Sequence, residues 1–329
     1  MKETATSRHS DTFKVVATTD AALDEKYRRA RERWEYHART LEVAPAPLDV
    51  DIEISSFCNL DCVMCERRRM TRTPMNMSLP LFKAIIDQCQ AIGVDQVKLN
   101  LWGESLVNPR FLDMVRYAKE NSDLILQFNT NANLLTPELS QGIVAAGLDK
   151  MTISFDGMSA PVYEKIRRKG KFQRVWDNVH ALLDAKHQAG SRLPLLTLQI
   201  LQTPDTLPEI EQFVAYWTGK ADFVSVTNIS ALVDQGILAQ SVREQKRSAE
   251  RIPCAEIWQR LSVFADGTVT VCCSDFQGFL AIGKIGEDRL LDLWRGEKLQ
   301  KLRQRHRVGD LEGLVCAQCT STFRYQEDA

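Results

Sequence analysis

Three closely spaced cysteines constrain this chain more than any other feature of its sequence. Cys58, Cys62 and Cys65 follow the pattern C-x3-C-x2-C, directly after Asp51–Ser55, which alternates in polarity as a short strand does. Three thiolates on one loop can hold three corners of a four-iron cluster and leave the fourth iron open to another ligand. A structural zinc site needs four protein ligands, and neither a fourth Cys nor a His lies nearby in sequence. Because a redox C-x-x-C pair would not require Cys58, the spacing favours an iron–sulfur loop.

Length and composition exclude several classes of protein. The 329 residues are enough for a barrel-sized domain and a smaller one, and 42 basic against 43 acidic residues create no global field that would attract nucleic acid or a membrane. We find no apolar run of about 18 residues, and Met1–Asp20 is too polar for a signal peptide. The nine cysteines cluster in ligand-like spacings, which predicts a cytoplasmic protein and not a secreted disulfide scaffold.

Strand and helix patterns alternate from Val50 onward. The expected strands are Asp51–Ser55, Gln96–Leu101, Leu124–Asn129, Lys150–Phe155, Leu195–Leu201 and Phe223–Val226. Ser78 caps the first intervening helix, in which Cys89 falls at core spacing; the next helices are Arg110–Glu120, Pro137–Ala146, Val175–His187 and Leu207–Trp217. Such an alternation predicts a parallel α/β layer with right-handed crossovers and with its chemistry at the carboxyl ends of the strands.

Polar motifs follow these strands where each one ends. In Trp102-Gly-Glu-Ser105, the Gly lets the backbone approach a ligand, and the carboxylate can accept a hydrogen bond from an ammonium group. Asn129-Thr-Asn131 supplies short polar groups, or simply an Asx-rich turn. Gln199 is either a ligand contact or a satisfied core amide. We interpret the basic run Glu66–Arg72 as a solvated loop or a screen for cluster charge, because it lacks the aromatic residues of a stacking site.

A second set of cysteines lies near the carboxyl end of the sequence. Asp266-Gly267 between two alternating apolar runs predicts a hairpin, and a helix is expected over Leu290–His306. Four thiolates around these elements suit zinc or a second iron–sulfur cluster, and the candidates are Cys254, one of Cys272 and Cys273, Cys316 and Cys319. Neighbouring side chains on a strand point to opposite faces, so Cys272 and Cys273 are not both expected to bind one cluster.

The cysteine loop resembles that of the radical S-adenosylmethionine (radical SAM) enzymes. In that family the open iron binds the methionine end of S-adenosylmethionine, and the residue before the last Cys is often aromatic, whereas this chain has Met64. The resemblance implies a partial (β/α)6 TIM-like barrel and these cofactor contacts: Gly103, Glu104, Asn129, Thr130, Asn131, Ser154, Asp156, Arg167 and Gln199. Glu104 corresponds to the carboxylate that binds the cofactor amino group, although Trp102 and Ser105 depart from the family's GGEP element. Arg167 corresponds to the partner of the cofactor carboxylate, with Arg168 as the alternative.

The carboxyl-terminal segment resembles the SPASM/twitch extension of the same enzymes. The shared features are the hairpin, the Cys after it, Gly283-Lys-Ile285, a helix with Leu290 and Trp294, and the final C-x-x-C. With five Cys where the full form has about seven, the resemblance implies one further [4Fe–4S] cluster, bound by Cys254, Cys272, Cys316 and Cys319. Cys273 is then a spare thiol, either a buried filler or a donor of a hydrogen atom to a substrate radical.

These inferences divide the chain into five segments. We expect an N-terminal tail and helix (1–47), the barrel (48–230), a linker (231–251), the auxiliary cluster module (252–322) and a short tail (323–329). Met1–Ala22 is expected to be loose at its start, and Leu23–Leu41 reads as an amphipathic helix that packs on the surface or covers the active site.

The resemblance also implies an activity. A 5′-deoxyadenosyl radical would abstract hydrogen from a C–H bond of a small carbohydrate-like substrate of the aminocyclitol or aminoglycoside type, giving dehydrogenation or epimerisation in natural-product biosynthesis. The expected partners are that substrate and an electron donor such as flavodoxin or ferredoxin, with neither nucleic acid nor membrane. Two alternatives remain open: a maturase of a ribosomally made peptide, for which Leu23–Leu41 could serve as a peptide contact, and a zinc-stabilised binding module without radical chemistry.

Overall fold

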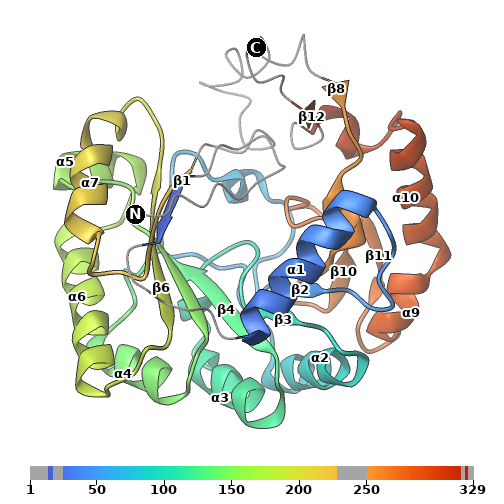
Figure 1. Ribbon diagram of the computed structural model, residues 1–329. Coiled ribbons are helices and arrows are strands. Elements are labelled where there is room, and N and C mark those ends of the chain that lie inside the picture. Colours follow the sequence, from blue (N-terminus) through green and yellow to red (C-terminus); the bar gives the residue numbers. More distant parts are fainter. Residues whose placement is uncertain (1–13, 18–24, 228–249, 320–322, 325–329) are drawn as a thin grey trace.

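A curved ten-stranded sheet forms the centre of the protein. The computed structural model describes residues 14–17, 25–227, 250–319 and 323–324, and Figure 1 shows the sheet with helices around its outside. The strand order is β1-β7-β6-β5-β4-β3-β2-β9-β10-β11. The bounds are β1 (Lys14–Ala17), β2 (Asp49–Ile52), β3 (Gln96–Lys98), β4 (Ile125–Thr130), β5 (Lys150–Ser154), β6 (Leu195–Leu201), β7 (Phe223–Thr227), β9 (Arg260–Val263), β10 (Thr268–Thr270) and β11 (Ala281–Lys284). A separate antiparallel pair joins β8 (Glu250–Arg251) to β12 (Phe323–Arg324).

Strands β2 to β7 run parallel in chain order, which confirms the predicted α/β half-barrel. The helices are α1 (Glu25–Thr40), α2 (Leu79–Ile92), α3 (Phe111–Asn121), α4 (Pro137–Ala145), α5 (Ala160–Ile166), α6 (Phe172–Gln188), α7 (Ile210–Trp217), α9 (Leu290–Arg295) and α10 (Glu297–Val308). Local sequence defines α2 well: the Ser78 hydroxyl accepts a hydrogen bond from the Leu81 amide, Pro80 lies in the first turn, and Gly93 ends the helix in a left-handed conformation. Cys89 is fully buried on this helix, as its spacing predicts.

The two faces of the sheet differ in polarity. Along β5 and β6, buried apolar residues alternate with half-exposed residues that are mostly polar, such as Thr152, Ser154 and Gln199. The apolar face packs against the helices and forms the main core, whereas the polar face lines the inside of the half-barrel. An antiparallel sheet that faces water shows the same alternation, but parallel sheets are usually buried on both faces. The inner face of this half-barrel is therefore suited to holding polar ligands.

Helix α1 lies across the end of the half-barrel at which the strands begin. The Tyr27 hydroxyl donates to Asp149, the residue before β5, at 2.9 Å. Arg33 pairs with Asp95, the residue before β3, at 2.6 Å. The cysteine loop follows the carboxyl end of β2, so α1 closes the opposite end and is not a lid over that loop.

The carboxyl-terminal module extends the barrel sheet. Strand β9 pairs in parallel with β2, so that Asp51 lies opposite Ser262, and β9 to β11 form the antiparallel continuation. The predicted hairpin at Asp266-Gly267 connects β9 to β10. In Figure 1 the helices α9 and α10 stand at the outer edge of this module.

Three segments differ from the expectations drawn from the sequence. The helix expected over Leu290–His306 is two helices, because the chain turns to an extended conformation at Gly296. Lys14–Ala17, within the segment expected to be loose, forms an edge strand antiparallel to β7. A short helix, α5, occupies Ala160–Ile166, where none was predicted.

Parts of the predicted linker and tails cannot be compared with the structure. Residues 1–13, 18–24, 228–249, 320–322 and 325–329 lie outside the described residues. In the part of the chain that the structure does describe, none of the helices combines the length and apolar character needed to span a bilayer.

Candidate cluster and cofactor site

The cysteine loop is held by the segment that follows β5. Two backbone hydrogen bonds of 3.0 Å join its amides to carbonyl groups of that segment, from Asp61 to Arg168 and from Val63 to Ile166. The thiols of Cys58, Cys62 and Cys65 are all free, and burial raises the pKa of Cys58 to about 12 and also raises that of Cys65. Buried thiols of this kind become stable thiolates only beside a positive charge or a bound metal.

Arg167 supplies a positive charge to the loop. Its Nη1 lies 3.6 Å from Cys62 Sγ, while its Nε and Nη2 donate to Asp156 Oδ2 at 2.7 and 2.6 Å. Asp156 is itself held through Oδ1, which accepts from the Leu201 amide at 2.7 Å. Burial lowers the pKa of Arg167, but the charges of Asp156 and Cys62 outweigh it, so the guanidinium stays charged. Arg167, and not Arg168, therefore points toward the cysteine loop.

Glu104 is an enclosed carboxylate between β3 and β4. Its Oε1 accepts hydrogen bonds from the Thr130 hydroxyl at 2.7 Å and the Leu106 amide at 3.3 Å, and its Oε2 accepts from the Asn131 amide at 2.8 Å. Burial raises the pKa of Glu104, and these donors oppose that rise. Among the described residues its partners are neutral donors, so a bound cation has lone pairs left to engage.

Gly103 has a steric reason to be Gly. Its φ of +105° disfavours any side chain, and a Cβ there would lie 2.2 Å from the carbonyl oxygen of Ser55. The Glu104 amide donates to the Phe57 carbonyl at 2.8 Å, so this segment packs directly on the chain that enters the cysteine loop. The structure thus brings the Trp102–Ser105 motif and the cysteine loop together, as the sequence predicts.

The remaining predicted cofactor contacts lie on the adjacent strands. Ser154 of β5 lies opposite Gln199 of β6, and the Gln199 amide donates to Thr227 at 2.9 Å. Asn131 Nδ2 donates to Asn59 Oδ1 at 2.9 Å, which joins the end of β4 to the cysteine loop. Sequence reasoning missed Asn59, although its position inside the cysteine motif was a usable signal. These residues stay predictions as ligand contacts, and the structure puts them at one end of the half-barrel.

Cys272 and Cys273 lie in different electrostatic surroundings. Burial raises the pKa of Cys272, and the neighbouring Cys273 thiol, followed by those of Cys254 and Cys319, raises it further. Together with burial, the thiols of Cys319 and Cys316 are among the groups that raise the pKa of Cys254. Burial likewise raises the pKa of Cys273, to about 11, and the charges that act on it are those of Arg260 and Glu256 in the carboxyl-terminal module and of Asp51 and Lys98 in the barrel. Both residues lie beyond β10, which ends at Thr270, with Cys273 in a turn, so the strand geometry from which they were expected to point to opposite faces does not apply to them.

Both sets of thiols suit iron–sulfur clusters by their chemistry. Cys58, Cys62 and Cys65 offer three sulfurs on one loop beside the Arg167 cation, and Cys254, Cys272, Cys316 and Cys319 offer four. Within the described ranges, no three Cys, His, Asp or Glu side chains converge as the ligands of a single metal ion would. Cysteines that bind a cluster reach different iron atoms, so they need not converge on one point.

The basic run after the cysteine loop is not simply solvated. Arg72 forms a two-pronged pair with Glu53, at 2.7 and 3.1 Å, and Glu53 is completely buried. The Arg72 guanidinium also lies 3.7 Å from the centre of the Phe264 ring and donates to the Phe276 carbonyl at 2.8 Å. The interpretation of the whole run as a solvated loop is thus wrong for Arg72. This residue joins the segment after the cysteine loop to the carboxyl-terminal module.

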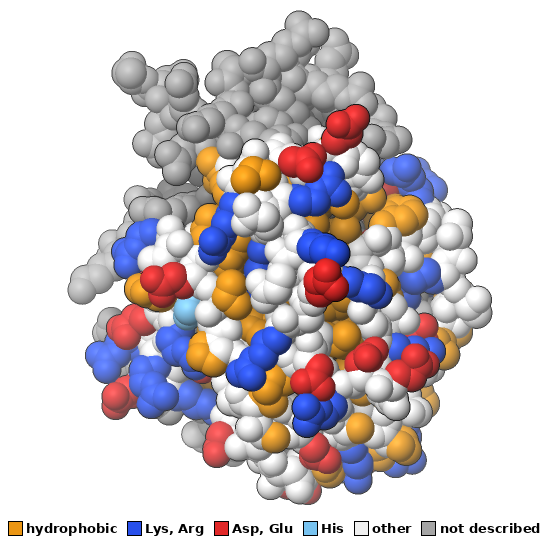
Figure 2. Space-filling view, turned by 90° about the vertical axis from the view of Figure 1, so that its right-hand side faces the viewer, with side chains coloured by type: hydrophobic (Ala, Val, Ile, Leu, Met, Phe, Trp, Pro, Cys, Tyr) orange, Lys and Arg blue, Asp and Glu red, His pale blue; other side chains and the backbone are white. Residues whose placement is uncertain are grey.

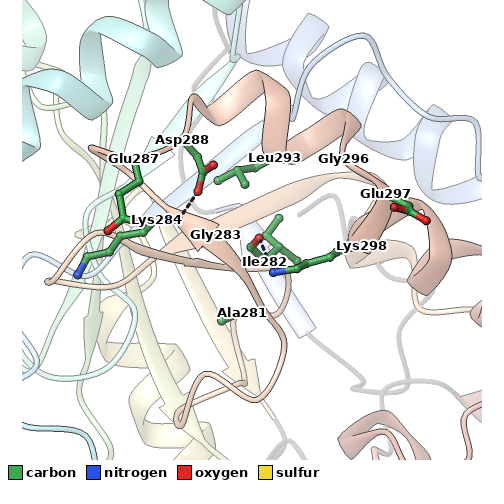
Figure 3. Close-up of a pocket in the computed structure, with 10 residues that line it drawn as sticks. All are labelled: Ala281, Ile282, Gly283, Lys284, Glu287, Asp288, Leu293, Gly296, Glu297 and Lys298. Carbon is green, nitrogen blue, oxygen red and sulfur yellow. Dashed lines mark hydrogen bonds between the residues drawn. The ribbon is translucent and has the colours of Figure 1, made fainter.

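Surface features of the module lie apart from these thiols. An open groove of about 620 Å³ is lined by β11, α9 and the start of α10, and Figure 3 shows that no Cys lines it. Two of its polar groups already bind the backbone, because Asp288 accepts from the Lys284 amide and Lys298 donates to the Ile282 carbonyl. In Figure 2, basic and acidic side chains intermingle over the face shown.

Comparisons with known proteins match both parts of the chain. The sequence matches the radical SAM superfamily over residues 52–214 and an iron–sulfur cluster-binding domain, SPASM, over residues 254–320. The mycofactocin maturase MftC of Mycobacterium tuberculosis is 34% identical over 168 residues, which cover 51% of this chain and 41% of MftC. The chain spans about half the length, or less, of such relatives.

Solved structures share the fold at low sequence identity. SuiB of Streptococcus suis, bound to its precursor peptide SuiA, has a TM-score of 0.65 and 13% identity, with 92% of this chain and 77% of SuiB covered. BtrN in complex with AdoMet and 2-DOIA has a TM-score of 0.54 and 18% identity, with 84% of this chain and 97% of BtrN covered. These likenesses establish the fold alone.

Proposed function

The chain is a radical SAM enzyme with an iron–sulfur cluster-binding SPASM domain, and on that premise we propose that it dehydrogenates or epimerises a small carbohydrate-like substrate. When bound, S-adenosylmethionine and its [4Fe–4S] cluster supply a 5′-deoxyadenosyl radical that abstracts a hydrogen atom from a C–H bond. The residues of this chain bind these cofactors, orient the substrate and decide what happens to it afterwards. Aminocyclitols and aminoglycosides are the substrate types that we favour.

The polar inner face of the half-barrel is the observation that carries this proposal. Half-exposed groups such as Gln127, Thr152 and Thr197 alternate with buried apolar residues on β4 to β6. Their side chains offer hydrogen-bond donors and acceptors at several heights, which suits a substrate with many hydroxyl groups. A mainly apolar substrate would leave these groups without partners, at an energetic cost for each.

The cysteines have separate roles in the proposal. Cys58, Cys62 and Cys65 hold the cluster that binds S-adenosylmethionine, and Glu104 and Arg167 lie beside it to receive the charged ends of that cofactor. Arg167 also orients Cys62 through its 3.6 Å contact, with Asp156 fixing the guanidinium. Cys254, Cys272, Cys316 and Cys319 hold the second cluster. A second cluster suits dehydrogenation, because that outcome requires an acceptor for the electron of the substrate radical.

Cys273 distinguishes the two outcomes. The charges of Arg260 and Glu256 in the module, and of Asp51 and Lys98 in the barrel, act on its thiol, which supports a position near the junction of the two parts. A hydrogen atom returned from this thiol to the opposite side of the substrate carbon gives the epimer and leaves a thiyl radical. One electron from the reductant, by way of the second cluster, and one proton from water convert that radical back to the thiol. Loss of a second hydrogen gives the ketone, and Cys273 then has no part in the chemistry.

The test is anaerobic reconstitution with iron, sulfide, S-adenosylmethionine and reductant, followed by mass analysis of candidate sugars and cyclitols. A product lighter by two hydrogens indicates dehydrogenation. A product whose mass is unchanged in ordinary water, but which gains deuterium in heavy water, indicates epimerisation. In the second case Cys273→Ala abolishes deuterium uptake, while Cys89→Ala, which removes a core thiol, preserves it. Failure of the reconstituted protein to form 5′-deoxyadenosine with any candidate refutes the proposal.

A peptide substrate is the second candidate, because the maturase MftC is among the relatives and SuiB was solved with its precursor peptide. A peptide would enter from the carboxyl ends of the strands, since α1 closes the other end through Tyr27 and Arg33. Parallel assays with free sugars and with a precursor peptide decide between the candidates. A maturase leaves free sugars unchanged and consumes S-adenosylmethionine only when a precursor peptide is added.

A further inference from the structure

A row of charged and amide side chains crosses the inner face of the half-barrel below the predicted cofactor contacts. Strand pairing puts Asp51 opposite Lys98, Lys98 opposite Gln127, and Gln127 opposite Lys150. Residues in register on parallel strands point to the same face. These four residues, called the inner row below, belong to β2, β3, β4 and β5, which lie side by side in Figure 1. Asn129 lies two residues farther along β4, toward the cysteine loop.

The inner row holds two cations, and among the described residues Lys98 lacks the aromatic contact that Lys150 makes with Tyr27. Its ammonium forms no ion pair or hydrogen bond with the side chains or backbone of residues that the structure describes, and the residue is half-buried. An ammonium group that is partly removed from water and left unpaired is costly, because its charge loses solvation without compensation. An anion stabilises such an ammonium group more than water alone does, because it accepts a charge-assisted hydrogen bond.

The carboxylates around Lys98 are already engaged. Asp51 accepts from Arg260 Nη1 at 3.1 Å and from the Ser262 hydroxyl at 3.4 Å. Arg260 also pairs with Glu256. Burial raises the pKa of Asp49 to about 8, so that this carboxyl is largely protonated at neutral pH. None of these carboxylates forms an ion pair with Lys98.

Asp51 adds an acceptor to the same region. Its Oδ1 is enclosed and has no hydrogen-bond partner among the described residues, and the residue is only 1% exposed. A buried carboxylate oxygen without a donor is unfavourable by an amount comparable to a lost hydrogen bond. A hydroxyl group of a ligand bound along the inner row can complete it after a small shift of the side chain.

The inner row is closed at one end by α1. Lys150 Nζ lies 4.8 Å from the centre of the Tyr27 ring, and the Arg260 guanidinium lies 4.7 Å from that of Trp34, so α1 forms a floor beneath the row. A ligand anchored by Lys98 therefore lies between this floor and the predicted cofactor contacts.

We propose that Lys98 binds an anionic group of the substrate, a carboxylate or a phosphate, on the floor of the half-barrel. This inference rests on the proposed function and narrows its carbohydrate-like substrates to those that carry such a group. Lys98 acts as a specificity-determining residue: its point charge selects the acid, and the amide of Gln127 and the carboxylate of Asp51 are placed to bind the hydroxyl groups.

Calorimetric titration of the reconstituted holoenzyme, with S-adenosylmethionine present, tests the proposal. The probes are D-glucuronate, glucose 6-phosphate, D-glucose and D-glucosamine, which share a ring and differ in charge. We expect one of the two acids to bind and the neutral and basic sugars to bind at least about tenfold more weakly, since a charge-assisted hydrogen bond supplies the difference. Comparison of the two acids distinguishes a carboxylate site from a phosphate site.

Variants separate the role of Lys98 from a structural one. Lys98→Gln should weaken binding of the acid by about ten- to a hundredfold, whereas Lys98→Arg should retain it within about threefold. Lys301→Gln, on the exposed side of α10, removes a Lys elsewhere and should change nothing. Circular dichroism of each variant confirms folding, and Lys98→Arg keeps the test valid if Lys98→Gln proves unstable.

Three results overturn the proposal: neither acid binds, glucose or glucosamine binds as tightly as the acids, or Lys98→Gln binds the acid as the parent does. Turnover of a neutral or basic sugar with formation of 5′-deoxyadenosine would leave the proposed function intact and remove only the role of Lys98. An enzyme that binds the acids but forms no 5′-deoxyadenosine with any substrate would instead refute the proposed function.

Discussion

Replacing Arg72 with Met should destabilise the protein more than any other change in the basic run Glu66–Arg72. Arg72 Nη2 lies 2.7 Å from Oε1 of Glu53, which is completely buried, while the Arg72 side chain is 19% exposed. Met keeps part of the apolar contact with Phe264 but removes the charge and the donor to the Phe276 carbonyl. The substitution thus leaves a buried carboxylate with the Ala265 amide as its remaining donor among the described residues.

The expected cost follows from this geometry. At 2.7 Å, the Coulomb attraction of the pair is about 6 kcal/mol at an effective dielectric constant of about 20. Desolvation of both groups offsets part of that attraction, and loss of one partner from a buried pair typically costs about 3–5 kcal/mol. For a chain of this size that corresponds to a fall in the midpoint of thermal unfolding of roughly 4–7 °C.

The pH dependence gives an independent check. Burial already raises the pKa of Glu53, with Arg72 opposing it, so removing Arg72 raises that pKa further. A group whose pKa is higher in the folded state loses its stabilising contribution as pH rises from its unfolded pKa through its folded pKa. The deficit of Arg72→Met should therefore shrink as pH falls from 8 toward 5.

The assay is anaerobic thermal unfolding of the reconstituted protein, followed by far-ultraviolet circular dichroism, for a double-mutant cycle of Arg72→Met and Glu53→Gln. We expect the pair to be non-additive by at least about 2 kcal/mol, because the neutral amide introduced by Glu53→Gln no longer needs a counter-charge. Arg68→Met is the matched control, since Arg68 pairs with Asp61 on the surface and should contribute less than about 1 kcal/mol. Additive effects in the cycle, or a midpoint for Arg72→Met equal to that of the control, would refute the reasoning.

Three further predictions concern other parts of the fold. Cys272→Ala should lose about four iron atoms per chain, whereas Cys273→Ala should retain them, and equal loss from both variants in an iron assay contradicts the assignment of the second cluster. Burial raises the pKa of Asp49 to about 8, so the parent protein loses stability as the pH rises from about 4 to about 8. The midpoint of thermal unfolding of Asp49→Asn should therefore rise relative to that of the parent between about pH 6 and 8.5. A constant difference between the two midpoints argues against a protonated Asp49. Tyr27→Phe removes the 2.9 Å hydrogen bond to Asp149 and should cost about 1 kcal/mol in chemical unfolding, and no loss would mean that α1 is held by its other contacts.

Local features of this protein could be predicted from the sequence because they depend on neighbouring residues. The spacing of Cys58, Cys62 and Cys65 limits which metal centre one loop can hold, and alternating apolar residues identify strands such as Leu195–Leu201, which the structure reproduces to the residue. The Ser78 cap and the Asp266-Gly267 turn are equally local, since each satisfies backbone groups or turn geometry a few residues away.

Only the tertiary structure decided how distant residues meet. The pairing of β9 with β2 makes the carboxyl-terminal hairpin part of the barrel sheet, and it puts Arg260 in reach of Asp51. Burial of Glu53 turns Arg72 from one of several basic residues into an interior ion pair. Likewise, Asp51 lies opposite Lys98 in the sheet but pairs with Arg260, so Lys98 has no ion-pair partner among the residues that the structure describes. These outcomes depend on which strands become neighbours and which groups lose water, and sequence separation carries little information about either.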